Sequence, residues 1–157
     1  MPASEGLPVS DQELELLREL TRAEVPFMIV GVSAAVLMGA DTVTKDIDLW
    51  FRSTSHPGVA EAARNVGGAF DWRSDPPLFS GPGLDSIDVV IRCDGLLDFD
   101  SEYANAMEVS LVPGLVVKVL PIERVLVSKK AADRPKDRAV IPSLEAAIAA
   151  IKESTSR

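Results

Sequence analysis

Two aspartates stand two positions apart in residues 45–51 (KDIDLWF), where polar and apolar residues alternate. Such alternation predicts a β-strand, on which residues two apart face the same way, roughly 6.5 Å from each other. Asp46 and Asp48 are therefore expected to share a face. Two carboxylates so placed suit a pair of hard divalent cations, which lie about 3.5–4 Å apart in two-metal sites. The pair predicts a Mg²⁺ or Mn²⁺ site.

A third carboxylate, Asp88, lies inside the apolar alternation of residues 86–92, a second predicted strand. An ionised aspartate in a dry strand is costly without a partner, and a metal shared with Asp46 and Asp48 would supply one. Asp88 could also take the proton of an attacking hydroxyl. Asp85 competes for this role, but it directly follows a glycine-rich loop, so Asp88 is preferred.

A site for an anion is expected just before the aspartate strand. Residues 26–31 read as a short buried strand, and residues 32–39 as a helix of small residues. Backbone N–H groups, a hydroxyl group and the positive end of the helix dipole converge at such a junction. Gly31 and Ser33 are therefore expected to hold a triphosphate.

The remaining elements must place these groups. Ser10 and Glu13 form a capping-box pattern that starts a helix, after a loose leader at residues 1–9. Further elements are expected as follows: a helix at 57–66, a strand at 69–72, a loop at 73–83, a helix at 96–107, a hairpin turning at Pro113 and Gly114, a helix at 121–134, and a last helix at 143–152.

Length and composition predict one domain in this chain of 157 residues. Residues 1–120 are expected to form its core, with residues 121–157 as a helical extension packed on it. The single histidine, His56, excludes histidine-rich zinc sites. The single cysteine, Cys93, excludes an internal disulfide and is read as structural.

Charge and hydropathy narrow the partners and the location. The net charge of −8 repels polyphosphate chains, so DNA is not an expected partner. No apolar run approaches the ~18 residues that a membrane span needs. No signal-peptide pattern occurs at the N-terminus. These features predict a cytoplasmic protein with no membrane partner.

Residues 31–51 (GVSAAVLMGADTVTKDIDLWF) resemble the signature of the DNA-polymerase-beta-like nucleotidyltransferase superfamily. There a Gly-Gly or Gly-Ser turn precedes an Asp-x-Asp strand, and a third acid follows on a later strand. More narrowly, the chain resembles small prokaryotic members related to abortive-infection and toxin–antitoxin nucleotidyltransferases. Their C-terminal helical element, with a lysine and a later Arg-x-Lys-Asp, is similar to residues 119–141 here.

The resemblance covers residues 27–144 and implies an α/β (α+β) fold: a mixed, twisted sheet flanked by helices, with a helical C-terminal tail. It implies that the metals are bound by Asp46, Asp48 and Asp88, the triphosphate by Gly31 and Ser33, and the nucleotide phosphates by Lys129, Arg134 and Lys136, with Asp137 as a supporting polar residue. By position alone, Lys129 fits a solvated helix face, and Arg134 and Asp137 fit a local ion pair.

Two departures from the family pattern bear on catalysis rather than on the fold. Val32 stands where glycine or serine is usual, and its side chain restricts the approach of a phosphate to the backbone. Asp41, Thr42 and Val43 occupy the stretch where many relatives carry an arginine, which removes a phosphate contact and adds a negative charge.

The predicted reaction is in-line attack of a hydroxyl group on the α-phosphate of an NTP, with pyrophosphate as the leaving group. The acceptor is a small molecule, a protein side chain or an RNA end. Two alternatives stay open. One is a weakly active or inactive nucleotide-binding module, regulatory or antitoxin-like, with a cognate partner protein or a second copy as its partner. The other is a metal-dependent phosphohydrolase that uses the same carboxylates.

Overall fold

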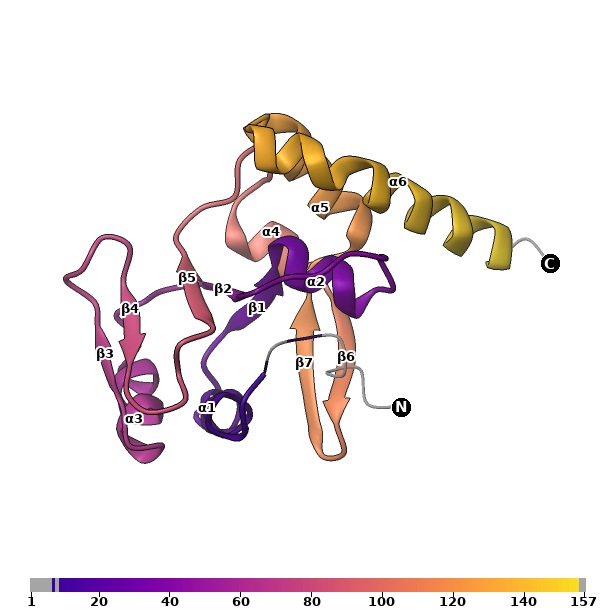
Figure 1. Cartoon of the computed structure of the whole chain (residues 1–157). Coiled ribbons are helices and arrows are strands. Elements are labelled where there is room, and N and C mark those ends of the chain that lie inside the picture. The colour runs from indigo at the N-terminus through magenta and orange to yellow at the C-terminus, as the bar shows by residue number, and fades with distance from the viewer. Residues whose placement is uncertain (1–6, 8, 156–157) are drawn as a thin grey trace.

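The computed structural model describes residues 7 and 9–155, so most of the predicted leader lies outside the described residues. Its main feature is a five-stranded mixed sheet (Figure 1) in the order β5-β2-β1-β7-β6. These strands are β1 (Phe27–Val30), β2 (Ile47–Phe51), β5 (Ile87–Val90), β6 (Met107–Val112) and β7 (Leu115–Val119). β1 pairs with β7 and β2 with β5 in parallel, and the other two pairings are antiparallel.

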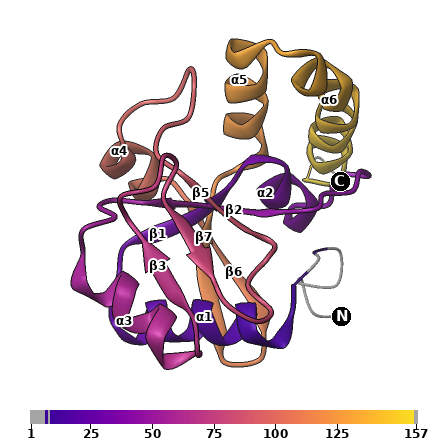
Figure 2. The same cartoon turned by 60° about the vertical axis from the view of Figure 1, so that its left-hand side comes forward.

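Helices flank this sheet, as the sequence predicts. They are α1 (Asp11–Arg22), α2 (Gly31–Leu37), α3 (Pro57–Asn65), α4 (Phe99–Ala104), α5 (Ile122–Ala132) and α6 (Pro135–Thr155). Figures 1 and 2 show α1 and α3 together at one end of the molecule, while α5 and α6 lie side by side at the other, next to α2.

The expected fold class is confirmed. The division at residue 120 stays a prediction, and in the described residues no helix is both long and apolar enough to cross a membrane.

The pleat of β2 separates the core from the site. Phe51 contacts Phe27 on β1 and Phe79, with ring centroids 6.0 and 6.2 Å apart, on the face that also carries the buried Leu49. Trp50 points to the other face and meets Phe99 of α4 edge-on at 5.4 Å. Because side chains alternate along a strand, Asp48 shares the face of Trp50.

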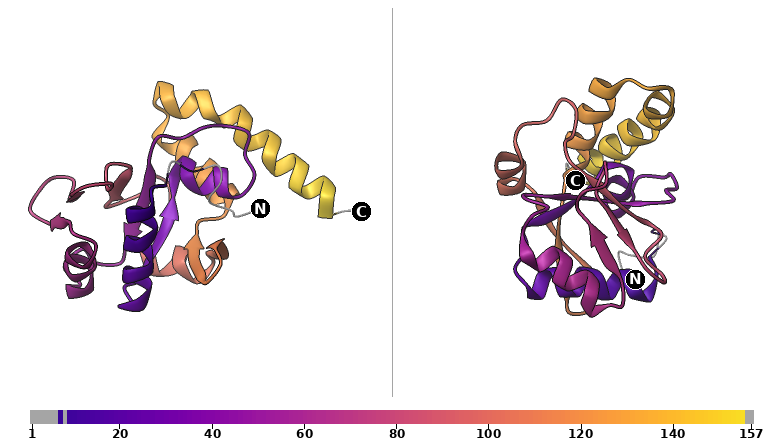
Figure 3. Two further views of the ribbon diagram at one scale, coloured as in Figure 1. Left: turned by 60° about the horizontal axis from the view of Figure 1, so that its bottom comes forward. Right: turned by 90° about the vertical axis from the view of Figure 1, so that its left-hand side faces the viewer.

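Two elements differ most from the sequence-based prediction, and the helix expected at 96–107 is also shorter, because α4 ends at Ala104 and Met107 begins β6. Residues 73–83, expected to be a loop, contain β4 (Leu78–Ser80), which pairs with β3 (Ala69–Asp71) in a small antiparallel sheet. Phe79 stabilises this pairing, because it is buried and its ring centroid lies 4.7 Å from that of Phe70. The many Pro and Gly residues of this stretch obscure so short a strand in the sequence. The last helix begins at Pro135 rather than at residue 143 and continues through Pro142, projecting beyond the sheet (Figure 3).

The capping box of α1 is confirmed, and it also anchors the sheet. Ser10 Oγ accepts from the Glu13 N–H at 3.0 Å, and the Ser10 N–H donates to Glu13 Oε1 at 2.9 Å. The other carboxylate oxygen of Glu13 accepts from the Ser86 N–H at 2.7 Å. The Ser86 carbonyl in turn accepts from the Ile47 N–H at 2.6 Å. One buried carboxylate therefore links α1 to the starts of β5 and β2.

Replacing Glu13 by alanine should lower the free energy of unfolding by roughly 2–4 kcal/mol, because two buried N–H groups lose their acceptor. The control is Glu15→Ala in the same helix, since the Glu15 side chain is 52% exposed and, within the part of the chain that the structure describes, pairs only with Arg18. Urea unfolding followed by circular dichroism measures both. Equal losses in the two variants would contradict the anchoring role of Glu13.

Candidate functional site

The predicted carboxylates gather at one edge of the sheet. Asp48 of β2 pairs in register with Asp88 of β5, so their side chains share a face. Asp46 precedes β2 rather than lying on it, and the Thr44 hydroxyl bonds its backbone N–H and carbonyl at 3.3 and 3.0 Å. Asp88 is exposed, which corrects the expectation of a dry strand: β5 ends the sheet, and Asp88 faces away from the buried Ile87.

The three carboxylates lie close enough for their negative charges to repel one another. Burial, together with the negative charges of Asp88 and Asp46, raises the pKa of Asp48 to about 6, against the opposing effect of Lys129 and Lys136. The pKa of Asp88 is also raised, by partial burial, by the charge of Asp46 and by a hydrogen bond with it. The cluster holds negative charge that the protein itself only partly neutralises.

Gly31 leaves the space that the Asp48 carboxylate occupies. Its backbone has a positive φ of 64°, which favours glycine. A Cβ atom at this position would collide with Oδ2 of Asp48. Residue 31 therefore requires glycine because of the close approach of Asp48, while the expected binding of a triphosphate at Gly31 stays a prediction.

Ser33 is not placed as expected. It is fully buried, and its hydroxyl donates to the Val30 carbonyl at 2.7 Å and accepts from the Asp48 N–H at 3.1 Å. Because both bonds are internal, the side chain does not face a ligand. Ser33 instead ties β1 to the residue that carries the central carboxylate.

A buried aspartate organises the basic side of the site. Asp137 is 1% exposed, and its Oδ2 accepts from Arg134 Nε at 2.7 Å and from the Arg134 N–H at 3.1 Å. Its Oδ1 lies 3.4 Å from Lys129 Nζ. Burial alone would raise the pKa of Asp137, but the hydrogen bonds from Arg134 and the charge of Lys129 hold it below its usual range. The local ion pair of Arg134 and Asp137 is thus present.

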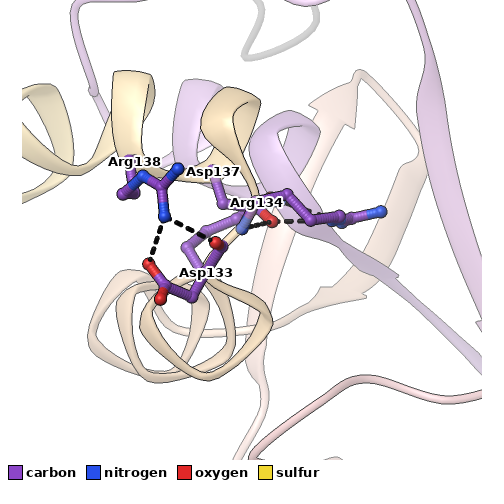
Figure 4. A network of polar contacts seen from close by, with 5 residues as sticks. Asp133, Arg134, Asp137 and Arg138 are labelled. Carbon is purple, nitrogen blue, oxygen red and sulfur yellow. Dashed lines mark hydrogen bonds and ion pairs between the residues drawn. The ribbon is translucent and has the colours of Figure 1, made fainter.

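The turn between α5 and α6 carries a second pair beside this one. Arg138 Nη1 donates to the carbonyl and the carboxylate of Asp133 at 3.0 and 3.2 Å (Figure 4). Asp133 ends α5 in the left-handed conformation. The Lys129 side chain is only 17% exposed, so the alternative of a solvated helix face for this residue is wrong.

A pocket of about 200 Å³ joins the acidic and basic groups. Of the predicted site residues its lining contains Gly31, Asp48, Lys129, Arg134 and Lys136, whereas Asp46, Asp88, Ser33 and Asp137 lie outside it. The lining also contains Arg92, Cys93, Asp94 and Ser128. Arg92 ends the predicted strand of residues 86–92, and Cys93 and Asp94 directly follow it, so their place at the end of a strand is the signal that could have found them. Burial raises the pKa of the Cys93 thiol to about 12, which fits its structural assignment.

The carboxylates fit a hard divalent cation in the chemistry of their oxygen donors and in their unneutralised charge. Within residues 7 and 9–155, however, no three His, Cys, Asp or Glu side chains are already arranged as ligands of one ion. Oxygen donors therefore lie around Asp48, without the arrangement that a bound ion would require.

Residues 10–155 match the model of a protein family described as nucleotidyl transferase of unknown function (DUF2204). No protein of curated function matches the chain.

Solved structures share the fold at low sequence identity. The antibiotic-resistance factor ANT(2'')-Ia in solution has a TM-score of 0.55 and 17% identity, over 89% of this chain and 82% of that one. The crystal structure of ANT(2'')-Ia with adenylyl-2''-tobramycin gives 0.52 and 17%, over 88% and 86%. An antigenic nucleotidyltransferase-like protein from Paracoccidioides brasiliensis gives 0.51 and 20%, over 87% and 77%.

Gly31→Ala should destabilise the protein more than Gly39→Ala. Both glycines have positive φ, of 64° and 99°, so alanine is strained by about 1–2 kcal/mol at either position. Only at Gly31 does the added methyl group meet Asp48, while nothing lies within 4 Å at Gly39. Chemical unfolding of both variants measures the difference. Equal destabilisation would show that the Asp48 carboxylate does not rest on Gly31.

In the metal-free protein, the Asp48 carboxyl should titrate near pH 6, well above its ordinary 3.8, when followed by carboxyl-carbon NMR. Asp88→Asn should lower this pKa, because it removes a like charge, and Asp85→Asn should not. Because the folded-state pKa is the raised one, this carboxyl contributes less stability as pH rises from 3.8 through 6. If the pKa of Asp48 is the same in Asp88→Asn as in the wild type, the two carboxyl groups do not interact.

Proposed function

The chain belongs to the family of nucleotidyl transferases of unknown function, as the match over residues 10–155 shows, and from this premise we propose the reaction that its site performs. The membership agrees with the resemblance to the DNA-polymerase-beta-like superfamily. We propose that the protein moves a nucleoside monophosphate from an NTP to a hydroxyl acceptor and releases pyrophosphate. The narrower resemblance to toxin–antitoxin members stays a prediction.

The observation that carries this proposal is the in-register pairing of Asp48 with Asp88, with Asp46 in contact. These three carboxylates would hold Mg²⁺ or Mn²⁺. When bound, the metal would stabilise charge on the transferred phosphoryl group and acidify the attacking hydroxyl. The raised pKa values of Asp48 and Asp88 support this role, since a cation relieves the repulsion that raises them.

Lys129, Arg134 and Lys136 are the residues that we assign to the nucleotide phosphates. All three line the pocket that Asp48 also lines. Asp137 would act as a positioning residue, because it holds Lys129 and Arg134 without reaching the pocket itself. The pocket volume of about 200 Å³ lies below the roughly 300–1,000 Å³ of common ligand pockets, so it fits the phosphate end while the base lies outside.

The proton of the acceptor hydroxyl needs a base. Asp88 suits this task, because it is exposed beside Asp48, where an acceptor can reach it. Gly31 would act by admitting the Asp48 carboxylate, and Ser33 by fixing the Asp48 backbone rather than by touching phosphate.

The acceptor we favour is a hydroxyl group of a small molecule or a protein side chain. The net charge of −8 disfavours a nucleic-acid polymer as the main acceptor. The crystal structure of the fold relative ANT(2'')-Ia contains an adenylylated small molecule, adenylyl-2''-tobramycin, which makes small hydroxyl compounds a reasonable first panel.

Incubation with α-³²P-labelled NTPs, magnesium and a panel of acceptors tests the proposal. The wild-type protein should transfer label, and Asp48→Asn or Asp88→Asn should reduce transfer by at least roughly 100-fold, because each removes charge stabilisation at the reacting phosphate. Asp85→Asn is the matched control, since Asp85 is exposed and outside the cluster, and it should transfer label normally.

Three results would contradict the proposal or redirect it. If Asp85→Asn abolishes transfer and Asp88→Asn does not, the third acid is Asp85. If free phosphate appears without labelled product, the site is that of a phosphohydrolase. If the NTP binds but no label moves with any acceptor, the protein is a nucleotide-binding module instead.

A further inference from the structure

Residues 91–98, the loop between β5 and α4, bring three side chains to the pocket that the proposed function does not use. These are Arg92, Cys93 and Asp94. This loop precedes α4 in the chain, whereas Arg134 and Lys136 come from the turn after α5 and the start of α6. Two separate chain segments thus bring cationic side chains to one small pocket.

The loop is held in place at both ends and in the middle. It leaves β5 at Val90, where that strand pairs with β2. Gly95 packs so closely on α5 that an added Cβ would lie 2.6 Å from Cβ of Ala131. Near its end, the Leu97 N–H donates to Glu102 Oε2 at 2.9 Å. Arg124 of α5 donates to both oxygens of Glu102, at 3.0 and 2.6 Å, so this end of the loop is also fixed to α5.

Arg92 resembles Lys136, and differs from Lys129 and Arg134, because its charge is not paired with another side chain of the described residues. Lys129 and Arg134 both contact Asp137. Among the described residues, Arg92 has neither a hydrogen bond nor an ion pair, yet it is part of the pocket lining. An arginine that lines a pocket, carries an unpaired charge and sits on an anchored loop is suited to a ligand with negative charge.

We propose that Arg92 is a further phosphate-binding residue, which contacts the β- and γ-phosphates that leave as pyrophosphate. This inference rests on the proposed function. A guanidinium group binds two phosphate oxygens at once, and this geometry suits the charge-rich end of a triphosphate. Asp48 and its neighbouring carboxylates occupy the acidic part of the site, so the transferred phosphate belongs there and the two leaving phosphates belong on the basic part.

The position of Arg92 predicts selectivity between nucleotides. A residue that contacts only the leaving phosphates strengthens binding of an NTP but not of the matching NMP. A merely structural role would weaken both ligands alike. Inorganic tripolyphosphate, which has no base or sugar, isolates the same contact.

Calorimetric titration of the full chain in magnesium tests this with three ligands: a non-hydrolysable NTP analogue, the NMP and tripolyphosphate. Arg92→Gln should bind the analogue and tripolyphosphate roughly tenfold more weakly than wild type and the NMP equally well, because one charge-assisted contact is lost. Arg64→Gln on α3 is the matched control, with the same change of charge at an exposed position outside the pocket. Circular dichroism should show both variants folded as the wild type is.

Unchanged affinities in Arg92→Gln, or an equal loss for the NMP, would overturn the role of Arg92. If the wild-type protein still transfers label in that case, the proposed function stands without it. If the wild type binds neither tripolyphosphate nor the NTP analogue and transfers no label, both proposals fail together.

Discussion

The site depends on one close contact, that of the Asp48 carboxylate with the backbone of Gly31. It fixes a charged group at the end of β1, and it is available only because residue 31 has no side chain and a positive φ. Ser33 secures the same arrangement from the other side by accepting from the Asp48 N–H. Once Asp48 is placed, parallel pairing of β2 with β5 brings Asp88 beside it. The acidic cluster is therefore a consequence of strand register.

Charge is divided across the pocket rather than balanced within it. The carboxylates of the cluster belong to β2, β5 and the turn before β2. The cations belong to α5, the turn after it, α6 and the β5–α4 loop, which also brings Asp94 to the pocket. Asp137 is buried and pairs with both Lys129 and Arg134, so it orders these basic groups and offsets one of their two positive charges. A ligand that combines a cation with a polyphosphate complements both parts.

Patterns among residues close together in the sequence were enough to identify the carboxylates of the candidate site. The Asp-x-Asp alternation, the capping box of Ser10 and Glu13, and the apolar run around Asp88 each reflect contacts between near neighbours. Ser33 and Arg92 were beyond such reasoning. The role of Ser33 depends on a partner 15 positions away, and that of Arg92 on the docking of a loop against α5. Likewise, exposure of Asp88 follows from the edge position of β5, which depends on the order of all five strands.

The order of these elements along the chain has a consequence for biosynthesis. The three carboxylates are encoded before residue 89, whereas Lys129, Arg134 and Lys136 come last and are positioned by β7 pairing with β1. Without α5 and α6, the carboxylates would lack the positive charges of Lys129 and Lys136, which oppose the rise in the pKa of Asp48 in the folded protein. The candidate site is therefore complete only once α5 has packed against α2 and α6 against α5.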